Sequence, residues 1–221
     1  MKLYYQEKGI TIYHGNCLEI LDHIEPVDLI LTDPPYNAKD IGTKHKKYEN
    51  QIMQIPNKEY KKFCKQWFTK CKKLSKNIVF TPGQINCWFY PQPKWMICCH
   101  KPAAVSFNLM GGYNAWEPIL IYGKPTQRIN QDYILCNTLN FNKGAEKDHP
   151  CPKPIKLIHF LMQSFSFPEQ TILDPFLGSG TSLIAAKNLG RKGIGIEQEE
   201  KYCEIAAKRL RQEVFDFNKS I

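Results

Sequence analysis

The sequence lacks several patterns that would place it in a familiar class of protein. No apolar run approaches the roughly 20 residues that a helix needs to cross a bilayer. Residues 1–7 have no apolar core of the kind found in signal peptides. No Gly-Lys-Ser/Thr is present, so a phosphate-binding P-loop is not indicated. With no repeat or low-complexity segment either, the sequence predicts a soluble protein without a membrane span.

Cysteine is abundant, but no two cysteines form a Cys-x-x-Cys pair. The sequence therefore predicts neither a zinc ribbon nor a thioredoxin-like centre, and we expect no metal site. An odd number of scattered cysteines is typical of small buried thiols in a reducing compartment. The expected localisation is cytoplasmic. The nine positions are 17, 64, 71, 87, 98, 99, 136, 151 and 203.

Length and charge narrow the class further. The 221 residues, 43% of them hydrophobic, suffice for one α/β domain with a core but not for two full domains. We therefore expect residues 1–221 to form a single domain. A net charge of +9 fits a polyanionic partner such as nucleic acid. A basic protein that binds no DNA is the plainer alternative.

Short apolar runs alternate with amphipathic segments, which predicts an α/β fold with a mixed, mostly parallel sheet and helices on both faces. Lysines gather on one face of the expected helix 58–76, which indicates either a solvated face or a DNA contact. The expected strands are 10–14, 27–32, 77–81, 95–99, 119–122, 171–173 and 193–196. The expected helices are 17–23, 58–76, 155–166, 181–189 and 199–217.

A glycine-rich turn joins the expected strand 171–173 to the helix that follows. Its two glycines let the backbone turn sharply and approach a ligand beyond the carboxyl end of the strand. Glu197 ends the next strand, about 20 residues later, where a carboxylate can accept hydrogen bonds from ribose hydroxyls. Position 183 is leucine, so the full Gly-x-Gly-x-x-Gly is absent, which favours a nucleoside ligand with little phosphate. An ordinary tight turn is the alternative. The turn reads Asp174-Pro175-Phe176-Leu177-Gly178-Ser179-Gly180-Thr181.

A tetrapeptide, Asp33-Pro34-Pro35-Tyr36, directly follows another expected strand. The prolines fix φ and remove two backbone donors, which leaves the Asp33 carboxylate and the Pro34 carbonyl as acceptors. These acceptors suit the exocyclic amine of a base. Holding both amine hydrogens favours a pyramidal nitrogen whose lone pair can attack a methyl sulfonium. Tyr36 would stack on the base, worth roughly 1–3 kcal/mol, after the base flips out of the duplex. A structural Pro-Pro turn is the alternative.

In this order the two motifs resemble the amino-methyltransferases of DNA, the N6-adenine and N4-cytosine family. The tetrapeptide precedes the glycine turn, as in the β group, a circular permutation of the usual methyltransferase. Permutation is physically mild because chain ends in compact domains often lie close together. The resemblance implies a Rossmann-like fold, S-adenosyl-L-methionine as the cofactor and double-stranded DNA as the substrate.

The resemblance also implies roles for particular residues. The catalytic set is Asp33, Pro34, Pro35 and Tyr36. Around the cofactor, Asn16 would face the adenine, although the family often has Asp there, and Glu197 would hold the ribose. Residues 116–120 look like the family's strand-entry motif near the base pocket. The full set implied to contact the cofactor is Asn16, Cys17, Asp33, Lys153, Asp174, Pro175, Phe176, Gly178, Ser179, Gly180, Thr181, Glu197 and Gln198.

Target recognition falls to the stretches 38–57 and 123–148, the candidate DNA-contacting loops; Arg128, Asn130 and Gln131 could reach base edges. The region of residues 37–148, which lies between the two motifs, is short for target recognition, so a homodimer or an accessory subunit could contribute to it. Asp33 favours adenine N6, since serine is commoner there in cytosine-N4 relatives. RNA or protein-glutamine methylation would favour asparagine at 33 and the reverse motif order. A non-catalytic DNA-binding module with a vestigial cofactor pocket is the remaining alternative.

Overall fold

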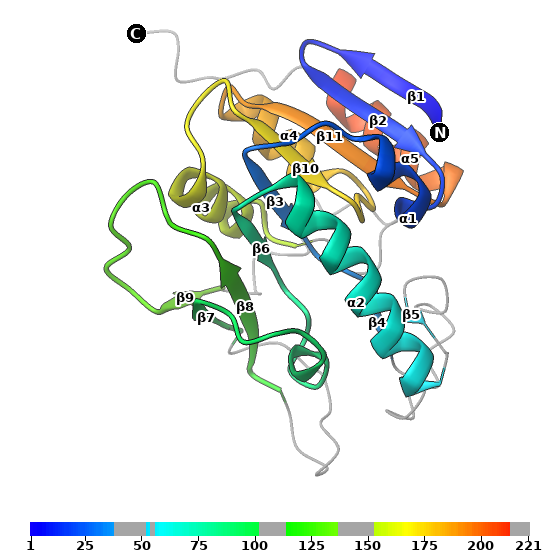
Figure 1. The fold of residues 1–221 in the computed structure, drawn as a ribbon. Coiled ribbons are helices and arrows are strands. Elements are labelled where there is room, and N and C mark those ends of the chain that lie inside the picture. The colour runs from blue at the N-terminus through cyan, green and yellow to red at the C-terminus, as the bar shows by residue number, and fades with distance from the viewer. Residues whose placement is uncertain (38–51, 54–55, 102–113, 137–152, 213–221) are drawn as a thin grey trace, which may run out of the picture.

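One large sheet organises the chain (Figure 1). The computed structural model describes residues 1–37, 52–53, 56–101, 114–136 and 153–212. Among these residues the strand order is β1-β2-β11-β10-β3-β6-β8-β7-β9. The bounds are β1 (Lys2–Glu7), β2 (Ile10–His14), β3 (Leu29–Thr32), β6 (Ile78–Phe80), β7 (Trp95–His100), β8 (Trp116–Tyr122), β9 (Tyr133–Leu135), β10 (Thr171–Asp174) and β11 (Lys192–Glu197).

The middle of the sheet is parallel and its margins are mixed. Strands β2, β11, β10, β3 and β6 run in one direction. Strand β8 runs against both β6 and β7, and β1 runs against β2. The predicted mixed, mostly parallel sheet is confirmed. Because β3 and β10 are parallel neighbours, their carboxyl ends meet at one edge.

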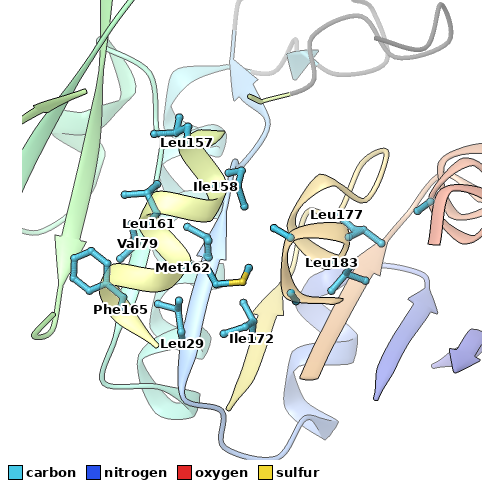
Figure 2. Packing of buried hydrophobic residues seen from close by; sticks show 14 of the residues in the cluster. Leu29, Val79, Leu157, Ile158, Leu161, Met162, Phe165, Ile172, Leu177 and Leu183 are labelled. Atoms are coloured by element: carbon cyan, nitrogen blue, oxygen red, sulfur yellow. The ribbon is translucent and has the colours of Figure 1, made fainter. Parts of the chain in front are cut away.

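Helices cover both faces of the sheet, as predicted. On one face lie α3 (Ile155–Phe165), α4 (Thr181–Asn188) and α5 (Glu200–Arg211). Figure 2 shows Met162 of α3 beside Leu29 and Ile172 of the strands. The opposite face carries α1 (Cys17–Ile20), α2 (Asn57–Leu74) and two short 3₁₀ turns, η1 (Leu21–His23) and η3 (Asn86–Phe89). A strand buried on both faces has a continuous apolar sequence, as β3 does.

An aromatic cluster fixes α2 against the sheet and the glycine turn. Trp67 of α2 is fully buried, and its ring centroid lies 5.2 Å from that of Phe80 on β6. It lies 5.3 Å from that of Phe176 in the glycine turn and 5.6 Å from that of Tyr90. Edge-on aromatic pairs at such distances add to the free energy gained from burial. This packing holds α2 beside both functional motifs.

The predicted helices and strands are present, with ends shifted by a few residues. Strand β3 begins at Leu29 rather than 27, and α5 ends at Arg211, while 213–217 lie outside the described residues. The stretch 38–57 was expected to lack regular structure. Its residues 52–53 nevertheless form β5 (Ile52–Met53), paired with β4 (Tyr36–Asn37), and residue 57 begins α2; 38–51 and 54–55 lie outside the described residues. No helix in the described ranges has the length and apolar character of a membrane span.

Two edge strands escaped prediction. Strand β1 pairs with β2 through a tight hairpin whose central residues, Lys8 and Gly9, have φ values of 48° and 80°. Such left-handed pairs are typical of the turns that connect adjacent antiparallel strands. Most residues of β1 are exposed, because an edge strand buries little of its surface. Strand β9, with two of its three residues exposed, is equally inconspicuous in the sequence.

Candidate active site

The two predicted motifs meet at the carboxyl edge of the sheet. Asp33 follows the last residue of β3, and Asp174 ends the neighbouring β10. A hydrogen bond joins the two strands at this edge: Thr32 Oγ1 donates to Asp174 Oδ1 over 2.6 Å, across 142 positions of sequence. The tetrapeptide and the glycine turn therefore belong to one site.

Asp174 holds the base of the glycine turn. Besides Thr32, it accepts hydrogen bonds from the Phe176 N–H at 3.0 Å and from the Ser182 hydroxyl of α4. The side chain is almost fully buried, and burial raises its pKa to about 6. With three donors supplied by this chain, the carboxylate lies beneath the turn and ties it to both β3 and α4.

Asp174→Asn is expected to change how stability depends on pH. The pKa of Asp174 is higher in the folded protein than its ordinary 3.8, so its contribution is present at low pH and lost as pH rises through about 6. Asparagine cannot ionise. The difference in unfolding free energy between variant and wild type should therefore shift in favour of the variant by about 2 kcal/mol between pH 4 and 7. Urea denaturation at several pH values measures this difference, and a pH-independent difference would contradict the assignment.

Glu197 anchors the open side of the turn. Its Oε2 accepts the Gly178 N–H at 2.8 Å, and its Oε1 accepts the Glu199 N–H at 2.8 Å. Gly178 and Gly180 have φ values of 54° and 87°, in the region that only glycine adopts freely. The Gln198 N–H also interacts with this carboxylate, and the side chain is only half-buried. Glu197 still has room to accept a hydrogen bond from a ligand, which fits a ribose hydroxyl.

The other side of the turn is held by α5. Arg209 donates to the Ser179 carbonyl at 2.6 Å and to the Ser179 hydroxyl at 3.0 Å. A Cβ at Gly180 would lie 2.8 Å from Cβ of Ala206, also on α5. Ser179 is buried and faces α5, so its hydroxyl is engaged within the protein. The contribution of Arg209 is not visible in the sequence, because no motif contains it.

The segment predicted to face an adenine lies beside Glu197. The Gly15 N–H donates to the Glu197 carbonyl at 2.9 Å, and the His14 ring nitrogen lies 3.0 Å from the Gln198 carbonyl oxygen. Asn16 caps α1, accepting the Leu18 N–H at 2.9 Å, and its side chain is exposed. Burial raises the pKa of the Cys17 thiol to about 12, so the thiol is neutral. Residues 14–16 and 197–198 thus form one continuous surface, with Cys17 buried beneath it.

The tetrapeptide presents the two acceptors that the sequence predicted. Asp33 Oδ1 accepts the Tyr36 hydroxyl at 2.7 Å and the Thr81 hydroxyl at 2.5 Å. The Tyr60 hydroxyl of α2 donates to the Pro35 carbonyl at 2.8 Å. In the described part of the chain, no donor reaches Asp33 Oδ2 or the Pro34 carbonyl. Oδ1 is held by the protein, while the described residues leave Oδ2 and the carbonyl able to accept further hydrogen bonds.

Tyr36 is fixed at both its hydroxyl and its ring. The hydroxyl donates to Asp33 and accepts from Lys153 Nζ at 2.9 Å. Burial and the Asp33 carboxylate raise the pKa of Tyr36 well above its ordinary value, so the phenol stays protonated. The ring lies against the backbone of Gly83, where a Cβ would be 3.3 Å from Cε1. The glycine after β6 therefore makes room for this ring.

Lys153 lies beside the tetrapeptide rather than beside Glu197. Its Nζ is 3.2 Å from Asp33 Oδ1 and 3.2 Å from Glu117 Oε2. Thr81, which the sequence analysis missed, follows β6 just as Asp33 follows β3. Because β3 and β6 are parallel neighbours, the residues that follow them lie close together, and this rule could have identified Thr81. Tyr60 and Lys101 carried no comparable signal in the sequence.

The stretch 123–148 begins at the opposite edge of the sheet. The Lys124 N–H donates to Asn77 Oδ1 at 3.0 Å, beside the start of β6. Thr126 bonds to the Ser164 carbonyl near the end of α3. Arg128 is exposed beyond this point, and 137–148 lie outside the described residues. The start of this stretch is thus distant along the strands from Asp33.

The strand order and the site together define the class of protein: a Rossmann-like methyltransferase fold with the Asp-Pro-Pro-Tyr tetrapeptide ahead of the glycine turn. The DNA methylase family model, which covers the N6- and N4-amino-methyltransferases, matches residues 27–208. The chain belongs to this family, and S-adenosylmethionine is its cofactor.

Individual relatives agree with this membership. The chain is 29% identical to the type II methyltransferase M.HinfI of Haemophilus influenzae, over 91% of this chain and 68% of the relative. It is 28% identical to the type II methyltransferase M2.MboI of Moraxella bovis, over 93% and 89% respectively.

Solved structures share the fold. The PvuII cytosine-N4-specific DNA methyltransferase matches with a TM-score of 0.74 at 18% identity, over 96% of this chain and 90% of that one. The M1.HpyAVI complex with S-adenosylmethionine matches with a TM-score of 0.64 at 22% identity, over 90% and 99%. The predicted Rossmann-like fold is confirmed.

Proposed function

We propose that this DNA amino-methyltransferase transfers the methyl group of S-adenosylmethionine to the exocyclic N6 of an adenine flipped out of double-stranded DNA. The observation that carries the proposal is the acceptor pair, Asp33 Oδ2 and the Pro34 carbonyl, which no described donor engages. Adenine is preferred over the alternative, cytosine N4, because aspartate rather than serine stands at position 33. The two relatives described above are type II methyltransferases, which supports a role in protecting DNA beside a restriction enzyme.

The chemistry follows from what the protein holds in place. The two acceptors would each take one amine hydrogen, which turns the nitrogen lone pair toward the methyl group. The cofactor supplies an electrophilic methyl on a sulfonium. As the nitrogen–carbon bond forms, the carbon–sulfur bond breaks and its electron pair stays on sulfur. The methylated amine then loses one proton, which the Asp33 carboxylate would accept. Tyr36 would support the base by stacking.

Several predicted residues fit the cofactor in different ways. Glu197 has room to accept a hydrogen bond from the ribose, and exposed Asn16 adjoins it for the adenine amine. Gly178 and Thr181 are half-buried, so their backbone can face a ligand at the turn. Asp174, Pro175 and Ser179 are buried, so we assign them to shaping the turn.

The basic helix α2 is the proposed contact for the DNA backbone. It carries seven lysines against one glutamate, a net charge of +6 in a chain whose net charge is +9. Among the described residues, only Lys70 of the seven forms an ion pair, with Asp22. The first turns of α2 adjoin the tetrapeptide through Tyr60 and through a 3.1 Å hydrogen bond from Asn37 to Asn57. Unpaired like charges beside the base site fit a phosphate backbone.

Replacing Lys61, Lys62 and Lys65 together by glutamine should weaken DNA binding and reduce its salt dependence. Each lost phosphate contact lowers the slope of log K against log salt by about 0.9. The matched control replaces Lys72, Lys73 and Lys76, which are equally exposed but lie toward the far end of α2 and beyond it. Fluorescence anisotropy with a labelled duplex at several salt concentrations measures both slopes. Equal slopes for the two triple variants would contradict this surface.

The proposed reaction is tested by locating the methyl group. Purified protein is incubated with methyl-labelled S-adenosylmethionine and, in separate reactions, with duplex DNA, tRNA, rRNA and protein. We expect label only in DNA, recovered as N6-methyladenine after digestion to nucleosides. Recovery as N4-methylcytosine would overturn the choice of adenine, and label only in RNA or protein would overturn the DNA assignment.

A further inference from the structure

Four charged side chains from four separate segments form a row of ion pairs that begins at Asp33 of the tetrapeptide. Lys153 Nζ lies 3.2 Å from Asp33 Oδ1 and 3.2 Å from Glu117 Oε2. Lys101, just beyond β7, places its Nζ 2.5 Å from the other Glu117 oxygen, Oε1. The charges alternate along the chain, and the two carboxylates balance the two ammonium groups.

These groups are too deeply placed to be an ordinary surface cluster. The side chains of Lys153 and Glu117 are 10% and 12% exposed, and that of Lys101 is 17% exposed. Burial favours the neutral amine of Lys153, but Asp33 and Glu117 outweigh it and raise its pKa well above the ordinary value. Burial likewise opposes the charge on Glu117, but Lys153 and Lys101 outweigh it and lower its pKa. Lys153 and Glu117 therefore both carry charge at neutral pH.

Lys153 brings both a benefit and a cost to methyl transfer. It fixes the Asp33 carboxylate, which supplies one of the two acceptors for the amine, and the Tyr36 hydroxyl beside it. Its positive charge, however, lies close to a reaction in which both the methyl donor and the methylated amine are positively charged. The methyl group arrives on a sulfonium, and the amine becomes cationic when the nitrogen–carbon bond forms. An uncompensated ammonium there would repel both species.

We propose that Glu117, with Lys101 behind it, balances the charge of Lys153, so that Lys153 orients Asp33 and Tyr36 without repelling the positively charged sulfonium. The inference rests on the proposed function of this edge of the sheet. Glu117 and Lys101 are positioning residues, because they act through Lys153 and not on the reacting atoms. Removing Glu117 leaves an excess positive charge, whereas removing Lys101 leaves an excess negative charge.

The two forms of the cofactor separate this electrostatic role from a structural one. S-adenosylmethionine is positive at sulfur and S-adenosylhomocysteine is neutral there, so the ratio of their affinities reports the charge felt at sulfur. Both ligands are titrated calorimetrically without DNA. Glu117→Gln should lower the ratio of the affinity for S-adenosylmethionine to that for S-adenosylhomocysteine about fivefold. Lys101→Met should raise that ratio by about as much. The double variant should return to within about twofold of wild type.

Glu7→Gln is the matched control. It removes one negative charge from the β1–β2 hairpin, at the opposite edge of the sheet, and should leave the ratio unchanged. Binding of S-adenosylhomocysteine shows that a variant has folded. If Glu117→Gln fails to bind S-adenosylhomocysteine, the test rests on Lys101→Met, for which the proposal requires a rise in the affinity ratio. A ratio moved in the same direction by both single variants, or by neither, would overturn the proposal. The assay contains no DNA, so its outcome is independent of which base is methylated.

Discussion

Asp33→Ala should abolish methyl transfer while cofactor binding survives. The variant removes Oδ2, the acceptor proposed to hold one amine hydrogen. It also removes Oδ1, which contacts Tyr36, Thr81 and Lys153. Losing a preorganised polar group that acts on the reacting atoms costs on the order of a thousandfold in rate. The glycine turn and Glu197 do not bond to Asp33, so the dissociation constant of S-adenosylhomocysteine should change by less than about threefold.

Single-turnover transfer of labelled methyl to duplex DNA measures the loss, and calorimetry measures cofactor binding. Thr81→Val is the matched control, because it removes one donor to Asp33 Oδ1 and leaves the carboxylate in place. That variant should lose no more than about tenfold in rate. Near-normal transfer by Asp33→Ala would show that the assigned role of Asp33 is wrong. Equal losses in the two variants would show that orientation alone, and not the acceptor, accounts for the effect.

Gly180→Ala should damage both folding and cofactor binding. Position 180 has a φ of 87°, and a Cβ there would lie 2.8 Å from Ala206 Cβ and 3.2 Å from its backbone Cα. The left-handed backbone and the overlap with α5 together should cost about 3 kcal/mol of unfolding free energy. Because the turn between Leu177 and Thr181 must move to relieve the overlap, affinity for S-adenosylmethionine should fall at least about tenfold.

Gly190→Ala provides the control for backbone strain alone. Its φ is 67°, also left-handed, but a Cβ there meets nothing within 4 Å. This variant should lose about 1 kcal/mol in urea denaturation and bind the cofactor as wild type does. If the two alanine variants were equally stable and bound the cofactor equally, the close approach of α5 to the turn would be contradicted.

The parts of the site that the sequence predicted are those encoded locally. The continuous apolar run of β3 predicted a strand buried on both faces, and the tetrapeptide at its end was visible at once. The positions of the glycines in a turn and of Glu197 at the end of a strand were likewise predictable from the local sequence. The meeting of Asp33 and Asp174 followed from a general property of parallel sheets, once both were placed after strands.

The residues that escaped prediction depend on which strands become neighbours. Glu117 meets Lys101 and Lys153 because β8 lies between β6 and β7, an order that local sequence patterns do not encode. Arg209 reaches Ser179 across 30 positions through the packing of α5 on the turn. Asp174 was predicted to flank the cofactor, but the hydroxyls of Thr32 and Ser182 that draw it beneath the turn became visible only in three dimensions.

The central claim is that one edge of the sheet joins an amine-binding tetrapeptide to a cofactor turn in order to methylate adenine in DNA. The most direct measurement is base-resolution sequencing, with nucleoside mass spectrometry, of DNA from cells that express the protein or its Asp33→Ala variant. We expect N6-methyladenine at one recurring short sequence with the wild-type protein and none with the variant. Methyl groups on cytosine N4, or DNA modified equally in both cultures, would contradict the claim.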